Sequence, residues 1–359
     1  MCLAVWAAVV VLCIVDWALS EVAAALRRST ATPSEAATAA PKASSNEAAE
    51  RPALELLQLF PPEWMPLSAF ELRMVASLRS AIAPTVWAAI PSDMLVAFVR
   101  GFAFHSAATR LADTERLLVT AAATRERLRT LELLREPPPD RDEWEQLYPV
   151  GPVGRDEEGH AIVVERIGQV VARQFCERYS LETPELMLRH AMYNREAARA
   201  LCRHLAHEQR RRLYKISVVI DMRGLGLGHM SIVFVRRLKL IISTLLDVYP
   251  EATTRMYVIN APRIFTSLLR IIRPVLDEVV IAKLQVFGGR DEYGPHFARL
   301  NWKLEQPIEG SRLSWSAEVE RLQLAGRAGG CSRPPWVPEE DRIALRTAGS
   351  ALPDADWGG

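Results

Sequence analysis

Lys215-Ile216-Ser217-Val218-Val219-Ile220-Asp221, KISVVID in one-letter code, is the stretch that decides the fold of this chain. Its apolar residues form a nearly unbroken run, which is typical of a central strand that is covered on both faces. Segments of strand length and of helical period alternate around it, at residues 161–167, 184–212, 231–248, 255–260, 263–276 and 283–287. This alternation predicts an α/β fold with a mixed, largely parallel sheet and flanking helices.

The residues before this pattern differ in composition. Residues 54–136 are rich in Ala, Leu, Arg and Glu and are interrupted by prolines, which predicts a small all-α domain of short helices. The clearest of these helices is expected at 113–134. Pro137-Pro138-Pro139 cannot continue a helix and indicates a domain boundary. We therefore expect a second domain at 140–305 and an irregular tail without functional signal at 306–359.

The N-terminal residues 1–20 are almost entirely apolar. They end in Ala18-Leu19-Ser20, which suits cleavage of a secretory signal peptide. Arg27 and Arg28 follow, however, and this charge bias favours an uncleaved membrane anchor that leaves the rest of the chain in the cytosol. A wrongly assigned start codon is a third interpretation, and the sequence does not decide among the three. Residues 21–53, mostly Ala, Ser, Thr, Pro and Glu, are typical of a disordered linker.

Composition and motifs argue against several classes of function. The 44 Lys and Arg against 43 Asp and Glu give a net charge of +1, so we expect no nucleic acid as partner. The five cysteines show neither a disulfide pattern nor metal-ligand spacing with the seven histidines. Gly224, Gly226 and Gly228 follow the central strand, but a dinucleotide-binding turn needs a glycine where His229 stands. We therefore expect no catalytic residue, no metal and no cofactor.

Two segments are predicted to be amphipathic helices. In 231–248, polar residues recur every three or four positions, and the cations among them exclude a membrane span. In 263–276, a broad apolar side is opposed by a basic side. The apolar side comprises Ile264, Phe265, Leu268, Ile271, Ile272 and Val275, and the basic side comprises Arg263, Arg270 and Arg273. From the pattern alone, such a helix packs on a core and exposes its polar rim.

Five phrases follow one another along the second half of the chain. They are Tyr148-Pro149 with residues 156–168, residues 219–224 ending in Asp-Met-Arg-Gly, Tyr249-Pro250-Glu251, residues 257–262 ending in Asn-Ala-Pro, and residues 273–277 with 281–284. This order resembles the CRAL-TRIO lipid-binding domain family, which includes the yeast phosphatidylinositol transfer protein and the retinal- and tocopherol-binding proteins. Residues 95–100 are similar to the small N-terminal helical domain of that family.

The resemblance implies a lipid pocket with the sheet as floor and helices as walls. Residues 263–276 would be its mobile gate, with the apolar side lining the pocket and the arginines facing the membrane. Phosphoinositide-binding relatives hold the headgroup with residues at the positions of Glu251 and Lys283, so these two are predicted to bind a lipid headgroup. A structural ion pair is the alternative. The family's arginine and threonine for this site are replaced by Phe102 and Val280.

We therefore expect a protein that binds a hydrophobic ligand such as a phospholipid, with a phosphoinositide as one candidate, and that transfers or presents it at membranes. We expect a monomer without enzymatic activity, peripheral to a membrane on its cytosolic side or anchored there by the N-terminal segment, with a secretory signal peptide still open. The alternatives are an interaction or regulatory scaffold that carries no lipid and, third, an enzyme acting on a lipid. The sequence does not identify the lipid.

Overall fold

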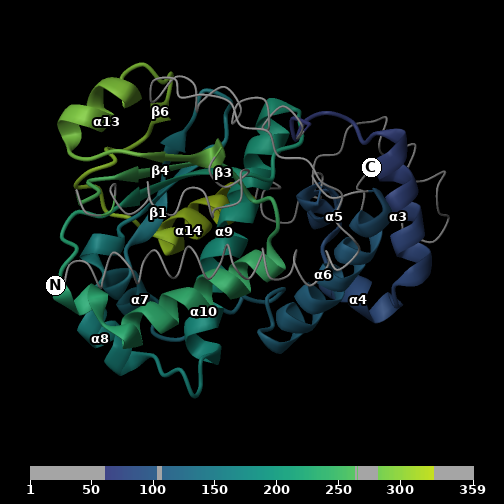
Figure 1. The fold of residues 1–359 in the computed structure, drawn as a ribbon, viewed down its shortest axis with the longest axis horizontal. Coiled ribbons are helices and arrows are strands. Elements are labelled where there is room, and N and C mark those ends of the chain that lie inside the picture. The colour runs from purple at the N-terminus through teal and green to yellow at the C-terminus, as the bar shows by residue number, and fades with distance from the viewer. Residues whose placement is uncertain (1–60, 103–106, 263–264, 266–281, 327–359) are drawn as a thin grey trace, which may run out of the picture.

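The computed structural model describes residues 61–102, 107–262, 265 and 282–326, and its centre is a six-stranded sheet (Figure 1). The strand order is β5-β4-β3-β2-β1-β6. Four strands run parallel, β2 (Ala161–Glu165), β3 (Ile216–Asp221), β4 (Thr253–Ile259) and β5 (Leu284–Val286). The other two, β1 (Val150–Arg155) and β6 (Lys303–Leu304), are antiparallel to their neighbours. The predicted mixed, largely parallel sheet is confirmed.

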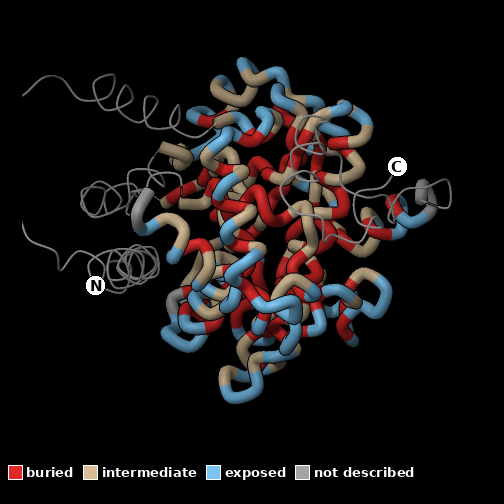
Figure 2. Tube along the Cα trace, turned by 90° about the vertical axis from the view of Figure 1, so that its right-hand side faces the viewer, coloured by how far each residue is buried: buried red, intermediate tan, exposed pale blue. Residues whose placement is uncertain are grey.

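The predicted central strand, β3, lies inside the sheet and contributes to buried clusters on both faces. Val219 belongs to one cluster together with Ile162 of β2. Ile216 belongs to a second cluster together with Val163. Because successive residues of a strand point to opposite faces, an unbroken apolar run serves both clusters at once. Figure 2 shows the result as buried chain through the middle of the molecule and exposed chain around it.

Helices cover the two faces unequally. The larger cluster is formed with α7 (Arg141–Leu147), α8 (Ala172–Arg178), α9 (Glu185–Gln209) and α10 (Ile232–Val248). α10 begins where expected because the Ser231 hydroxyl accepts a hydrogen bond from the backbone N–H of Phe234 at 3.1 Å. The opposite face packs against α13 (Arg290–Phe297) and the buried side chains of Ile308 and Leu313.

The N-terminal helices lie to one side of the sheet, at the right of Figure 1. They are α3 (Ala69–Ala81), α4 (Pro84–Ala89), α5 (Ser92–Gly101) and α6 (Ala107–Arg127). Prolines separate them as predicted, since Pro84 is the first residue of α4 and Pro91 directly precedes α5. The helix expected at 113–134 is wrong in its bounds. α6 ends at Arg127, and Arg129 takes a left-handed conformation (φ 53°) in the turns that follow.

The C-terminal part corrects a second expectation. A helix, α14 (Trp315–Gly326), lies in the tail that the composition predicts to be irregular. Trp315, Val319 and Leu322 recur at helical spacing and are buried in the same cluster as α9. Ser314 begins the helix by accepting a hydrogen bond from Ala317 N–H at 3.1 Å. Residues 315–326 therefore belong to the folded body.

Candidate functional site

An apolar surface lies on one face of the sheet where β3, β4 and β5 meet. Ile220, Met222, Val258, Leu284 and Val286 share one cluster, and we call these five residues the sheet floor. Residues of the pairs Ile220–Val258 and Val258–Val286 are direct neighbours across the parallel strands. Because alternate residues of a strand share a face, the three strands present a continuous apolar area to one side. The resemblance predicts a pocket floor on this sheet, and that this area lines a pocket stays a prediction.

Phe265 packs on the sheet floor and is only 1% exposed. It is one of the residues predicted to line the pocket, and Ala261 joins it in the cluster. The remaining predicted residues of this segment lie outside the described residues. They are Ile264, Leu268, Ile271, Ile272 and Val275 on the apolar side and Arg263, Arg270 and Arg273 on the basic side. Their roles in lining a pocket and facing a membrane stay predictions.

Two of the phrases in the sequence meet at the carboxyl ends of β3 and β4. The buried Asp221 accepts hydrogen bonds from the backbone N–H of Arg223 at 2.9 Å and from Nδ2 of Asn260 at 2.7 Å. Asn260 has a φ of 53°, a left-handed conformation that asparagine adopts more readily than most residues. This link determines the point at which the chain leaves β4 for the segment that contains Phe265.

The two residues predicted to bind a headgroup lie in direct contact. Lys283 Nζ is 2.8 Å from Glu251 Oε2, and Lys215 Nζ is 2.5 Å from Glu251 Oε1. The side chains of Glu251, Lys283 and Lys215 are 6%, 13% and 10% exposed. The ion pair that the sequence left as an alternative is thus present. Lys215 is not among the predicted site residues, although its position directly before the central strand could have indicated a charged group at this edge of the sheet.

The electrostatics of this cluster favour the charged forms of Glu251 and Lys215. Burial opposes ionisation of Glu251, but the ammonium groups of Lys215 and Lys283 outweigh it and hold the pKa of this carboxyl below its usual value. Burial also opposes the charge of Lys215, and the neighbouring Tyr214 and Glu251 raise its pKa in spite of it. A role in headgroup binding stays a prediction.

Residues 145–313 match the family model described as the CRAL/TRIO domain. This part of the chain belongs to the CRAL-TRIO family. The sheet, its floor, the Asp221–Asn260 link and the Glu251 cluster all lie within the matched CRAL-TRIO residues. The family assignment inferred from the ordered phrases is therefore confirmed.

Curated relatives are similar to this chain over about two fifths to three fifths of its length. The phosphatidylinositol/phosphatidylcholine transfer protein SFH7 of Arabidopsis thaliana is 27% identical over 209 residues, 56% of this chain and 34% of that protein. The SEC14 cytosolic factor of Yarrowia lipolytica is 30% identical, over 42% of this chain and 30% of its own length. The Sec14 cytosolic factor of Schizosaccharomyces pombe is 31% identical, over 37% of this chain and 46% of its own length. The chain thus spans less than half the length of these relatives.

Among solved structures, the crystal structure of Sfh5 is similar at 17% identity and a TM-score of 0.43, over 59% of this chain and 70% of that one. Within the described ranges, no helix is long and apolar enough to cross a membrane. The same residues contain no group of His, Cys, Asp and Glu side chains that could hold a metal ion.

A second polar cluster joins the CRAL-TRIO domain to the residues before α3. His160 Nε2 lies 2.8 Å from Glu63 Oε1, and His160 Nδ1 lies 3.2 Å from Asp156 Oδ2. Glu63 Oε2 also accepts hydrogen bonds from the backbone N–H groups of Tyr214 and Lys215, at 3.0 and 2.9 Å. Burial lowers the pKa of His160, but the two carboxylates outweigh it and raise this pKa to about 9.

The His160 cluster predicts that the free energy of unfolding decreases as the pH becomes mildly alkaline. The raised pKa of His160 means that its contribution is complete below pH 6.5 and is lost as the pH rises through about 9. We expect a loss on the order of 2 kcal/mol in the free energy of unfolding between these values. Urea denaturation at pH 6.5, 8 and 9.5 measures it. His160→Gln should flatten the profile, and an unchanged slope in that variant would refute the assignment.

Proposed function

We propose that the protein binds a phospholipid between the sheet floor and the segment that follows Asn260-Ala261-Pro262, and exchanges it at membranes. The observation that carries this proposal is the sheet floor itself, on which Phe265 from that segment packs. Acyl chains would pack on the sheet floor as the side chain of Phe265 does. The protein would carry and release the lipid without making or breaking a covalent bond.

The energetics of lipid transfer explain why a carrier needs this architecture. One buried methylene group is worth about 0.8 kcal/mol, so two acyl chains exposed to water would cost on the order of 20 kcal/mol. A protein that shields both chains makes the exchange nearly neutral, because bilayer and pocket are both apolar. Its contribution is then to lower the barrier, by opening against a membrane and staying closed in water.

The outer face of α10 supports a membrane as the partner surface. Ile232, Val233 and Ile242 are 54%, 45% and 44% exposed. Arg236 and Lys239 are exposed on the same helix. Apolar side chains among cations suit an anionic bilayer, where each cation contributes about 1 kcal/mol. Because two of the relatives are named cytosolic factors, we place this protein on the cytosolic side of a membrane.

Lys283→Ala tests the headgroup role of the Glu251 cluster. Because Lys215 would still pair with Glu251, the variant should fold normally. We expect uptake of phosphatidylinositol to fall about tenfold, since a charge-assisted hydrogen bond to phosphate contributes about 1.5 kcal/mol or more. Uptake of phosphatidylcholine should change little. The measurement is the transfer of each labelled lipid from donor vesicles to the purified protein.

Lys303→Ala is the matched control for this experiment. Lys303 is exposed on β6, away from the Glu251 cluster, and its removal takes away the same charge. The control should take up both lipids as the unmodified protein does. If Lys283→Ala also takes up phosphatidylinositol normally, the cluster is a structural ion pair and the headgroup lies elsewhere.

Analysis of the bound lipid separates a carrier from a scaffold. The protein is purified without added lipid, extracted with organic solvent and examined by mass spectrometry. A phospholipid in about equimolar amount supports the proposed carrier and identifies the ligand. A protein that contains no lipid and takes none from vesicles would instead be an interaction or regulatory module that uses a CRAL-TRIO fold.

A further inference from the structure

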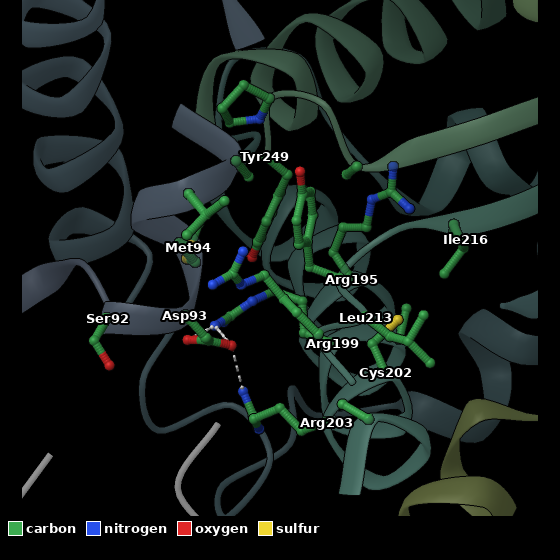
Figure 3. A pocket seen from close by; sticks show the side chains of 18 residues that line it. Ser92, Asp93, Met94, Arg195, Arg199, Cys202, Arg203, Leu213, Ile216 and Tyr249 are labelled. Carbon is green, nitrogen blue, oxygen red and sulfur yellow. Dashed lines mark hydrogen bonds and ion pairs between the residues drawn. The ribbon is translucent and has the colours of Figure 1, made fainter. Parts of the chain in front are cut away.

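A cavity of about 60 Å³ lies between the N-terminal helices and the CRAL-TRIO domain. α5 forms one wall and α9 the facing wall, and residues 212–216 and 249–252 contribute the rest (Figure 3). A water molecule needs about 10–15 Å³ of such a cavity, so there is room for a few waters or for one group of phosphate size. The cavity is separate from the sheet floor, with which it shares no residue.

The cavity is lined by an excess of positive charge. Arg195, Arg199 and Arg203 follow one another at successive turns of α9, and Arg212 also lines the cavity. Asp93 of α5 contributes the carboxylate among the lining residues. Like charges four residues apart on a helix repel one another, so this row is unfavourable unless anions compensate it.

Asp93 compensates only part of the row. Its two carboxylate oxygens each lie 2.6 Å from NH2 of Arg199, and Oδ2 lies 3.3 Å from NH1 of Arg203 (Figure 3). NH1 of Arg199 is used by Glu196, at 2.6 Å. Of the three guanidinium nitrogens of Arg203, only NH1 bonds to Asp93, and the other two take no part in these hydrogen bonds. The side chains of Arg199 and Arg203 are 11% and 20% exposed, so water screens them weakly.

Arg195 stands apart from this arrangement. Its guanidinium makes no hydrogen bond or ion pair with any residue in the described part of the chain, and its Nε is buried without a partner. Burial lowers the pKa of Arg195, and the nearby Tyr249 and Glu165, which act on it only through their charge, offset this in part. A buried donor that lacks a partner is unfavourable, and such donors in native proteins are usually satisfied by a water molecule or an ion. The free donor therefore leaves room for a hydrogen-bond acceptor, and the arginines around it favour one of negative charge.

We propose that this cavity binds a phosphate group, which Arg195 holds with hydrogen bonds while Arg199 adds its charge. The fork of a guanidinium matches the oxygens of phosphate, and one such anion together with Asp93 would balance most of the row. The group would lie between α5 and α9 and would connect the N-terminal helices to the CRAL-TRIO domain. This site is additional to the proposed lipid pocket and does not depend on it.

Thermal unfolding of the full chain in phosphate tests the proposal. Inorganic phosphate is the probe, and chloride at the same ionic strength is the reference. We expect phosphate at saturating concentration to raise the Tm by about 3 °C or more. Arg195→Gln should abolish this rise. Arg173→Gln, which removes a charge from a side chain that is 88% exposed on α8, should keep it.

The possible results lead to distinct conclusions. No rise with phosphate, or an equal rise in Arg195→Gln, would overturn the proposal and leave the lipid carrier untouched. If Arg195→Gln does not fold, Arg195→Lys takes its place; it keeps the charge but loses the guanidinium fork, and the rise with phosphate should then be at most about half as large. Phosphatidylinositol uptake from vesicles then identifies the source of the phosphate. If the variant loses the phosphate response alone, the ligand is a free phosphate, and if it loses both, the ligand is the lipid headgroup.

Discussion

Replacement of Arg125 by methionine is expected to lower the free energy of unfolding by about 3–5 kcal/mol. Arg125 is fully buried in α6, and its NH1 lies 2.7 Å from Glu196 Oε1 in α9. Its Nε donates to the carbonyl of Ala89 at 2.7 Å. Burial opposes ionisation of Glu196, but Arg125 and Arg199 outweigh it and lower the pKa of this carboxyl to about 2. Methionine fills the space but leaves a buried carboxylate with half of its counter-charge.

Arg127→Met is the matched control because it removes an ion pair between the same two helices. Arg127 NH1 lies 2.9 Å from Glu185 Oε1, but these side chains are 47% and 52% exposed. An exposed pair contributes less than about 1 kcal/mol. Adding Glu196→Leu to Arg125→Met should restore part of the stability, because no carboxylate then stays buried. Urea denaturation measures all of these variants, and equal losses for Arg125→Met and Arg127→Met would contradict the assignment.

Replacement of Gly168 by alanine is expected to cost at least about 3 kcal/mol of stability. Gly168 lies in the short 3₁₀ turn Ile167–Gln169 that follows β2. A Cβ at this position would lie 2.3 Å from the carbonyl oxygen of Arg223 and 2.5 Å from that of Met222. Both oxygens belong to the backbone after β3. These carbonyl groups cannot shift freely, because the Asp221 carboxylate fixes this turn by accepting hydrogen bonds from Arg223 N–H and from Nδ2 of Asn260.

The close approach between the turn at Gly168 and the backbone after β3 explains why positions 168 and 224 in the family phrases are both glycine. Gly224 has a φ of 89°, and a Cβ there would lie 2.8 Å from the carbonyl oxygen of Gly168. Gly226→Ala is the control, since its φ is −137° and its Cβ would meet nothing closer than 3.8 Å. We expect that control to lose less than about 1 kcal/mol. Thermal unfolding compares Gly168→Ala with Gly226→Ala. Equal stability of the two variants would show that the backbone after β3 can move away from position 168 at little cost.

Most of the sheet could be predicted from local patterns. The expected strands at 161–167, 215–221 and 255–260 correspond closely to β2, β3 and β4, because buried parallel strands have an apolar signal of their own. β1 escaped prediction because its sequence, VGPVGR, contains glycines and a proline and its register shifts between Pro152 and Gly154. α14 was not predicted because its buried residues Trp315, Val319 and Leu322 are spaced among charged ones.

The candidate site was predicted in part. The resemblance supplied the positions of Glu251 and Lys283, which lie in contact as the ion-pair alternative expects, and the structure adds Lys215 as a third member. Their role in headgroup binding stays a prediction. Neither Arg125–Glu196 nor the arginine row of α9 was singled out. In the sequence these residues are charged positions on helices, which usually face solvent. Nothing local distinguishes a buried arginine from an exposed one.

The sequence by itself determined the α/β order, the central strand and the family phrases, because periodicity and turn residues act between near neighbours in the chain. Only the tertiary structure decided which charges are buried and which partners they meet. Arg125 and Glu196 are 71 residues apart, and Lys215 and Glu251 are 36 apart. The energy of a charge depends on its desolvation and on its counter-charges, and both are defined only once distant segments have packed together.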